Sequence, residues 1–415
     1  MARTLATTTR RRALIGAGAT MLGAGGARAA PDEEALGRSA GYPVGTRSNW
    51  FYDERVRVGS FSNLDAIMPH NRLPRAPAPR PLPRGEDLAD LRYTFEGGAR
   101  SIDDFLARQR VTGLMVVRGG AVLAERYQYD RTPAHRFVSQ SMAKSITSIG
   151  VGFAVAEGRI RSVDDMASAY VPAIAGVPYG DTSIRDLLRM SSGVAFSERY
   201  DGRDDAAKFA GIQARDGTVA GLRAFTTREA PPGRRFHYAS IETATLAVVL
   251  HAATKQTLSA YIGERLWRPM GAEADATWVV DPTGTERAGG NFSATLRDWG
   301  RLAVLLADDG ARDGRQIVPR DWLLEATDWR RQPAAFAPRV ATPFFGYGYQ
   351  FWTFPADKRR FALLGVYGQS IFVDPELRLA LVITAAARNA SVGKESLAGE
   401  RNALWRALVG RYGKW

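Results

Sequence analysis

The chain has 415 residues, a formal net charge of +13 and no cysteine. The lack of cysteine excludes disulfide bonds, thiolate metal sites and a cysteine nucleophile. The four histidines lie far apart and do not have the spacing of a metal site. The charge comes mostly from arginines scattered along the sequence, and no basic helix or aromatic-basic module gathers them. We therefore expect no metal, no other cofactor and no nucleic-acid partner.

The first thirty residues have the pattern of an export signal. Arg10-Arg11-Arg12 precede an apolar stretch rich in alanine and glycine, and Ala27-Arg28-Ala29 is typical of a cleavage site. Paired arginines directly before the apolar stretch resemble a twin-arginine signal, with a plain secretory signal or a membrane anchor as alternatives. We predict a signal peptide over 1–29 and a periplasmic or secreted protein. No later stretch reaches about 18 uninterrupted apolar residues, so no membrane span is expected in the mature chain.

The next segment, residues 30–100, shows no sustained helical or strand period. Five prolines fall between Pro74 and Pro83, where they are interspersed with arginine and alanine. Proline lacks the backbone N–H that helices and sheets use. This irregular segment is therefore predicted to run as an extended strap over the surface of the domain.

Regular elements begin at about residue 101. Ser101 precedes a stretch with acidic residues in its first turn, which predicts a short helix over 101–110. Residues 114–127 are two apolar stretches around Arg118-Gly119-Gly120, which predicts a β-hairpin. Residues 157–290 are predicted to be mostly helix and loop. Strand patterns return late, at 347–354, 361–364, 369–373 and 379–384, before a closing helix over about 395–409.

Strands on both sides of a helical middle predict one sheet that is completed by the two ends of the chain. The predicted organisation is a signal at 1–29, a strap at 30–100 and a domain at 101–410. A mostly helical part is inserted into that domain at about 157–290.

Ser141-Met142-Ala143-Lys144 opens a predicted helix that continues as an apolar run of small residues. Residues i and i+3 share a helix face, so the Ser141 hydroxyl and the Lys144 amine can meet there. Burial lowers the pKa of a lysine, which lets its amine take the hydroxyl proton. Backbone N–H groups at the start of the helix can stabilise an oxyanion. The chain has only six lysines, so one at the head of a buried helix indicates a catalytic role.

A third polar group is needed to pass the proton to the leaving group, and Tyr238 is the candidate. It lies in Tyr238-Ala239-Ser240, between a proline-glycine turn and an apolar helix. A phenol near a lysine ammonium can be stabilised as a phenolate, which we expect to act as the general base. Half-buried packing is the alternative role for this tyrosine.

Four motifs occur in one order: Ser141-x-x-Lys144, then Arg185 to Gly193, then Tyr238-x-Ser240, then Gly289 to Asp298. This set resembles the class C β-lactamase-like serine hydrolases over roughly residues 100–410. The superfamily includes β-lactamases, penicillin-binding proteins, family VIII esterases and 6-aminohexanoate-dimer hydrolases. The resemblance implies an α/β (α+β) fold of the β-lactamase/transpeptidase type, in which helices flank an antiparallel sheet and a mostly helical domain is inserted.

The resemblance also implies roles for individual residues. Ser141 would be the acylated nucleophile, Lys144 its activating partner and Tyr238 the general acid/base. The oxyanion hole would use the Ser141 N–H and a backbone N–H from an edge strand, which we place at Val366. Tyr200, in the loop after the second motif, would contact the scissile amide, and Ser240 would lie on the substrate side.

Two departures from the β-lactamase pattern affect the predicted substrate. The segment Leu364 to Gln369 has no Lys-Thr-Gly, and the third motif reads Tyr-Ala-Ser rather than Tyr-Ala-Asn. Both favour a serine hydrolase of the 6-aminohexanoate-dimer hydrolase type, which cleaves a small-molecule amide or ester through an acyl-enzyme. A family VIII-type esterase or a weak β-lactamase or D-Ala-D-Ala carboxypeptidase is the alternative within the class. A non-catalytic binding protein on the same scaffold is the alternative outside it.

Overall fold

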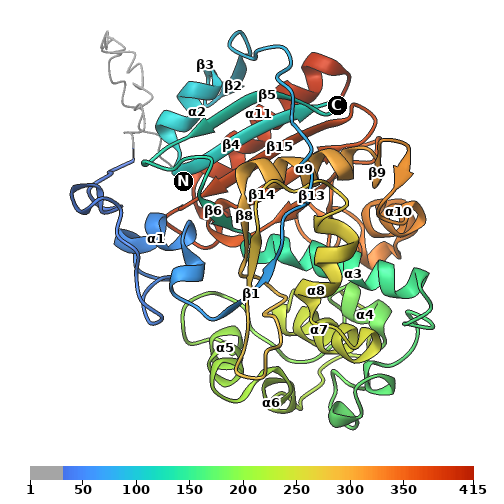
Figure 1. Ribbon diagram of the computed structural model, residues 1–415. Helices are drawn as coiled ribbons and strands as arrows, with labels where there is room; N and C mark the ends of the chain where they lie inside the picture. Colours follow the sequence, from blue (N-terminus) through green and yellow to red (C-terminus); the bar gives the residue numbers. More distant parts are fainter. Residues whose placement is uncertain (1–30) are drawn as a thin grey trace, which may run out of the picture.

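The computed structural model describes residues 31–415, and the predicted signal peptide lies outside the described residues. Its centre is a seven-stranded antiparallel sheet (Figure 1), with the strand order β11–β12–β13–β14–β15–β4–β5. The strands are β4 (Val111–Arg118), β5 (Ala121–Tyr127), β11 (Gly346–Tyr347), β12 (Trp352–Thr353), β13 (Phe361–Leu364), β14 (Ser370–Asp374) and β15 (Leu379–Ala385).

The sheet joins the two ends of the domain, as the sequence predicts. Strand β15 pairs with β4, so that Ala380 lies opposite Val117. The predicted hairpin is formed by β4 and β5 around Gly119 and Gly120, whose φ angles are 56° and 87°. A two-residue hairpin turn of this kind needs positive φ at both positions, which explains the two glycines.

Helices cover both faces of this sheet, and the side chains of β4 alternate between them. Val117 belongs to the core beneath α9 (Leu296–Ala307), whereas Val116 packs with α11 (Ser396–Tyr412) on the other face. Because neither face of β4 meets water, its sequence is a nearly continuous apolar run.

A mostly helical layer lies beside the sheet (Figure 1). Its members are α3 (Ala143–Ala156), α4 (Ile184–Leu188), α5 (Asp205–Asp216), α6 (Thr218–Arg223), α7 (Ser240–Thr254), α8 (Leu258–Ile262) and α10 (Arg320–Thr327). Helix α3 is buried along almost its whole length and packs against α7 and α8. The residues that precede and begin α3 are thereby fixed where this layer meets the sheet.

The structure differs from the sequence prediction in three places. The segment expected to be irregular contains α1 (Glu54–Phe61), the strand β1 (His70–Leu73) and the small hairpin β2 (Tyr93–Phe95) and β3 (Gly98–Arg100). Strand β1 belongs to a second sheet, in the order β1–β7–β8–β6. The other strands of this sheet are β6 (Arg136–Val138), β7 (Ala276–Val279) and β8 (Phe292–Thr295), and β7 lies inside the region expected to be helix and loop.

The third difference is the strand expected at 347–354. It is split into β11 and β12, because the chain bends at Gln350, whose φ is 64°. The Gln350 amide is buried and turns inward, where it donates to the carbonyl oxygens of Leu187 and Leu188.

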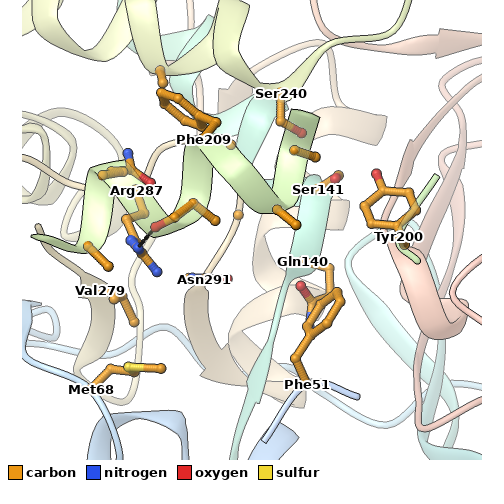
Figure 2. Close-up of a pocket in the computed structure, with 18 of the residues that line it drawn as sticks. Phe51, Met68, Gln140, Ser141, Tyr200, Phe209, Ser240, Val279, Arg287 and Asn291 are labelled. Atoms are coloured by element: carbon orange, nitrogen blue, oxygen red, sulfur yellow. Dashed lines mark hydrogen bonds between the residues drawn. The ribbon is translucent and has the colours of Figure 1, made fainter. Parts of the chain in front are cut away.

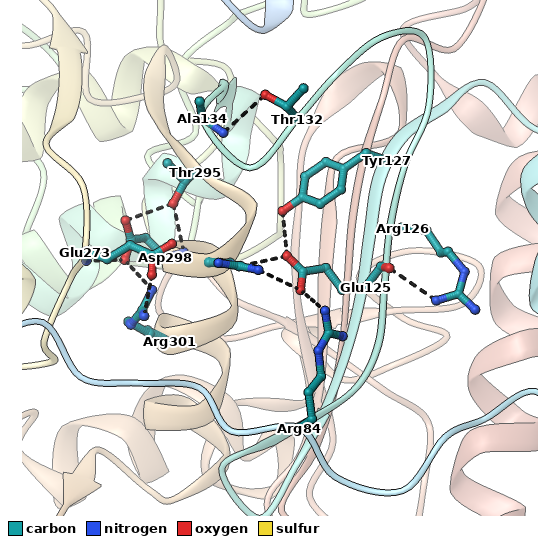
Figure 3. A network of polar contacts seen from close by, with 11 residues as sticks. Arg84, Glu125, Arg126, Tyr127, Thr132, Ala134, Glu273, Thr295, Asp298 and Arg301 are labelled. Carbon is teal, nitrogen blue, oxygen red and sulfur yellow. Dashed lines mark hydrogen bonds and ion pairs between the residues drawn. The ribbon is translucent and has the colours of Figure 1, made fainter.

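The proline-rich segment does run extended over the surface, and polar contacts fasten its end (Figure 3). The Glu125 carboxylate on β5 accepts hydrogen bonds from Arg84, directly after the last proline of this segment, and from Arg297 on α9, both at 2.8 Å. On the same helix Asp298 accepts from Thr295 and pairs with Arg301. The last part of the fourth motif is therefore structural.

Candidate active site

Ser141 lies at the junction between the second sheet and α3. It follows β6 in a 3₁₀ turn, Gln140–Met142, that runs directly into α3. Gln140 has a φ of 43°, a left-handed conformation that costs a non-glycine residue of order 1–3 kcal/mol and is typical of functional sites. The Ser141 side chain faces a cavity of about 640 Å³.

Lys144 lies one helical turn after Ser141, as the spacing predicts. Its Nζ donates hydrogen bonds to the Ser141 Oγ at 2.9 Å and to the carbonyl oxygen of Gly289 at 2.6 Å. Only 1% of the residue is exposed. Burial lowers the pKa of Lys144 to about 8, although the nearby Glu198 carboxylate raises it. A substantial fraction of the amine is therefore neutral near pH 8 and can accept the serine proton.

Tyr238 lies two residues before α7, and its ring stacks on Trp352 with 5.6 Å between ring centres. The Lys144 Nζ lies over the ring face, 5.1 Å from its centre. Burial and then the charge of Glu198 raise the pKa of Tyr238 well above its ordinary value, and a hydrogen bond with Ser141 only partly offsets them. The phenol is therefore held protonated, whereas the sequence analysis expected a phenolate base. The reason is burial of the hydroxyl, together with the nearby Glu198 charge, while the Lys144 amine lies over the ring face.

Tyr200 joins the same cluster and lines the cavity. Its hydroxyl donates to Glu198 Oε1 at 2.5 Å, and a hydrogen bond with Ser141 is among the influences on its pKa. Burial and Glu198 raise the pKa of Tyr200 well above its ordinary value. The backbone has a φ of 60° at this residue and is held by a hydrogen bond from its N–H to Asp204. Tyr200 is thus a fixed member of the site rather than an exposed loop residue.

Glu198 was not identified from the sequence, and it connects two of the site residues, Tyr200 and Ser240, through three hydrogen bonds. Its carboxylate accepts from the Tyr200 hydroxyl, from the Ser240 hydroxyl at 2.5 Å and from the Ser240 N–H at 2.6 Å. Ser240 lines the cavity as predicted, but its polar groups serve to hold Glu198. The sequence feature that could have identified Glu198 is its place two positions before Tyr200, a predicted site residue.

Val366 lies in the cavity wall together with Ser141. It opens a 3₁₀ turn after β13, and the first N–H groups of such turns have no acceptor within the turn. Ser141 also lies in a 3₁₀ turn, so its N–H likewise has no acceptor within that turn. Gly365 allows this turn to lie close to the backbone before Ser141, because a Cβ at position 365 would lie only 2.5 Å from the Ser139 carbonyl oxygen. Strand β13 is not the edge strand that was expected, but β12 pairs only with its first two residues.

Three parts of the chain form the remaining walls of the cavity. Helix α5 contributes Phe209 and Ala210, and the segment between β7 and β8 contributes Arg287 and Asn291. The third wall comes from the N-terminal segment, with Arg47, Trp50, Phe51, Tyr52, Met68 and Pro69. In Figure 2, Arg287, Val279 and Met68 lie on one side of the cavity, and Ser141 and Tyr200 lie on the other.

No group of three or more histidine or acidic side chains within residues 31–415 could hold a metal ion. No helix in that part of the chain is long and apolar enough to cross a membrane.

Comparison with known proteins agrees with this architecture. The chain is 28% identical over 354 residues to the 6-aminohexanoate-dimer hydrolase of Paenarthrobacter ureafaciens, which covers 82% of this chain and 87% of that protein. A Bacillus anthracis protein named as a candidate 6-aminohexanoate-dimer hydrolase superposes with a TM-score of 0.77 at 22% identity, over 88% of this chain and 96% of that one. The octameric penicillin-binding protein homologue of Pyrococcus abyssi has a TM-score of 0.56 at 20% identity, over 75% and 76% of the two chains.

The fold and the pairing of Ser141 with the buried Lys144 define a serine hydrolase with the fold of penicillin-binding proteins and β-lactamases. A model of the β-lactamase family matches residues 99–401, and the chain belongs to that family. The whole N-terminal wall of the cavity precedes the matched region.

Proposed function

We propose that this hydrolase cleaves a linear amide or ester through an acyl-enzyme on Ser141. The observation that carries the proposal is the buried Lys144 amine, 2.9 Å from the Ser141 Oγ, with a pKa of about 8. In its neutral form the amine takes the hydroxyl proton while Oγ attacks the substrate carbonyl. The Ser141 and Val366 N–H groups would stabilise the oxyanion.

The protonated tyrosines complete the cycle. As the tetrahedral intermediate collapses, Tyr238 gives its proton to the leaving nitrogen or oxygen and recovers one from the Lys144 ammonium, so no net charge accumulates. Tyr200 would contact the scissile group. In the second half, water attacks the acyl-enzyme and gives up a proton to the same groups, which return it to Ser141. Glu198 is the positioning residue for this proton path.

Two observations favour linear amides and esters over β-lactams. The segment after β13 reads Gly365-Val366-Tyr367-Gly368-Gln369 and offers no lysine for a β-lactam carboxylate. The relative from Paenarthrobacter ureafaciens is named for a linear amide substrate. A charge-assisted hydrogen bond contributes roughly 1.5–3 kcal/mol, so we expect penicillins to be hydrolysed much more slowly than short esters.

A substrate panel tests the proposal. Wild type and Ser141→Ala are compared on a p-nitrophenyl ester, a linear aliphatic amide and benzylpenicillin. The proposal expects turnover of the ester and the amide by wild type only. Turnover of benzylpenicillin as fast as the best ester would refute the substrate class, and full activity of Ser141→Ala would refute the nucleophile.

A further inference from the structure

Two arginines line the cavity, Arg47 and Arg287, and Arg287 has no direct acidic partner within the part of the chain that the structure describes. Arg287 lies two residues before Gly289, the glycine whose carbonyl oxygen accepts from Lys144. Its Nη2 donates to the carbonyl oxygen of Ala210 on α5 at 3.0 Å, and its buried Nε has no hydrogen-bond partner within residues 31–415. Among those residues no carboxylate forms an ion pair with it. Arg287 as a whole is half-buried, but its buried Nε is an unused donor, which is costly unless a ligand supplies the acceptor.

The acidic groups around Arg287 are already occupied. Asp281, which acts on it at longer range, accepts hydrogen bonds from Thr218, Thr283 and Thr285. The two carboxylates in the cavity wall are also engaged. Glu198 holds Ser240 and Tyr200, and Asp204 accepts from backbone N–H groups that begin with Arg199. The Arg287 charge is therefore available to an anion that enters the cavity.

The arrangement indicates which part of the substrate meets Arg287. The leaving group must face the tyrosine cluster, where Tyr238 protonates it and Tyr200 contacts the scissile group, and Tyr200 lies on the far side of Ser141 from Arg287 (Figure 2). The acyl chain must then extend in the opposite direction, along Phe209 and Val279. Both side chains are apolar and buried, and they suit a run of methylene groups.

We propose that Arg287 binds a terminal carboxylate on the acyl part of the substrate, so that the preferred substrates are half-amides or half-esters of aliphatic dicarboxylic acids. This inference rests on the proposed acyl-enzyme function. Ser141 would be acylated by an ω-carboxyacyl group while the amine or alcohol leaves with a proton. Water would then release the free dicarboxylic acid. The unused Arg287 Nε and a second guanidinium nitrogen can hold the carboxylate in a bidentate pair.

Three p-nitrophenyl esters of matched chain length test the inference: the monoester of adipic acid, the hexanoate and the ester of 6-aminohexanoic acid. Wild type should show kcat/KM in the order carboxylate, neutral, ammonium, with steps of roughly tenfold to a hundredfold. Arg287→Gln should abolish the preference for the carboxylate, and Arg287→Glu should shift it towards the ammonium. Arg215→Gln is the matched control. Arg215 lies on α5, the helix that Arg287 contacts, but its side chain is 71% exposed. This variant should keep the wild-type order of the three esters.

The inference is overturned by equal kcat/KM for the three esters in wild type. It is also overturned if Arg287→Gln keeps the preference, or loses all three activities equally, which would mean that Arg287 only supports the wall. If wild type hydrolyses none of the esters, the proposed function fails instead, and titration calorimetry with adipate still tests Arg287. Should Arg287→Gln not fold, competition in wild type decides: adipate must inhibit hexanoate ester hydrolysis much more strongly than 1,6-diaminohexane.

Discussion

At the residue scale, the chemistry depends on the lowered pKa of one buried lysine, Lys144. Lys144 lies in the buried first turn of α3, and its Nζ has two neutral hydrogen-bond acceptors, the Ser141 Oγ and the Gly289 carbonyl oxygen. Burial disfavours the ammonium form, and Glu198 only partly restores it. The same burial keeps the two phenols protonated. The site thus contains a base and two acids whose pKa values are shifted in opposite directions.

The pH dependence of ester hydrolysis follows from the Lys144 pKa. The amine acts as a base only when it is deprotonated, and burial places its pKa at about 8. We expect kcat/KM to rise with an apparent pKa near 8 and to fall about tenfold for each pH unit below it. Lys144→Arg should lose several powers of ten in rate at every pH, because arginine stays protonated. A flat profile, or an active arginine variant, would show that Lys144 is structural.

Glu198 provides a second prediction at this scale. Its charge raises the pKa of Lys144, so Glu198→Gln should lower that pKa and move the rising limb of the pH–rate profile to lower pH. The amide oxygen of glutamine can still accept from the hydroxyl groups of Tyr200 and Ser240, and only the bond from the Ser240 N–H, which needs the second carboxylate oxygen, is lost. The control is Glu229→Gln, since this carboxylate is 58% exposed and pairs with Arg235. A shift of the limb to higher pH in Glu198→Gln would contradict the role given to this carboxylate.

At the element scale, α3, α4 and α7 are held together by one buried amide. The Gln350 side chain accepts from Thr243 on α7 at 2.7 Å and donates to Leu187 on α4 at 2.9 Å, and its backbone carbonyl oxygen accepts from Ser145 on α3. These bonds fix the helix that carries Lys144 against the helix that follows Tyr238. They also explain why the strand expected here is interrupted.

Gln350→Ala should therefore destabilise the protein by roughly 2–4 kcal/mol, because it leaves buried donors and acceptors unpaired and opens a cavity. Urea unfolding measures the loss. Thr243→Val removes one of the same bonds, so a double-mutant cycle should give a coupling of about 1 kcal/mol or more. Additive effects would mean that the Gln350 amide does not join α7 to the rest of this layer.

The helices and strands with strong periodicity were predictable, and those set by distant contacts were not. The sheet β13–β14–β15–β4–β5, the Ser-x-x-Lys turn and the closing helix follow from local apolar patterns. Strands β1 and β7 are four residues each, and they are strands because they pair with one another. Glu198 was missed for a related reason, because only the fold brings it to Ser240 and Tyr200.

At the scale of the whole molecule, the N-terminal segment completes the cavity. Arg57 on α1 is 2% exposed, and it donates to the carbonyl oxygens of Ala387, after β15, and of Tyr52, in the cavity wall, at 2.7 and 2.9 Å. Its guanidinium lies over the ring of Tyr367, 4.1 Å from the centre. The wall that precedes the family-matched region is thus anchored on the catalytic domain.

Arg57→Met should destabilise the protein by roughly 2–4 kcal/mol, since it leaves buried carbonyl groups without donors. It should also raise KM more than it lowers kcat, because the released wall contacts substrate and not the nucleophile. Arg55→Met, at an exposed position on the same helix, should stay within about 0.5 kcal/mol of wild type. An unchanged KM in a folded Arg57→Met variant would mean that the N-terminal wall does not contribute to substrate binding.

Export by the twin-arginine route stays a prediction, because the signal lies outside the described residues. Sequencing the N-terminus of the mature protein checks it, and the expected first residue is Ala30 or Pro31. A mature protein whose N-terminal sequence still begins at Met1 or Ala2 would contradict cleavage near Ala29.

The covalent intermediate is the most direct test of the proposed mechanism. Wild type and Ser141→Ala are treated with a fluorophosphonate and, separately, with a slowly hydrolysed ester, and intact mass spectra are recorded before peptide mapping. The mechanism predicts one added group per wild-type chain, on the peptide that contains Ser141, and none on Ser141→Ala. An adduct of equal yield on Ser141→Ala, or a wild-type adduct mapped to another residue, would contradict it.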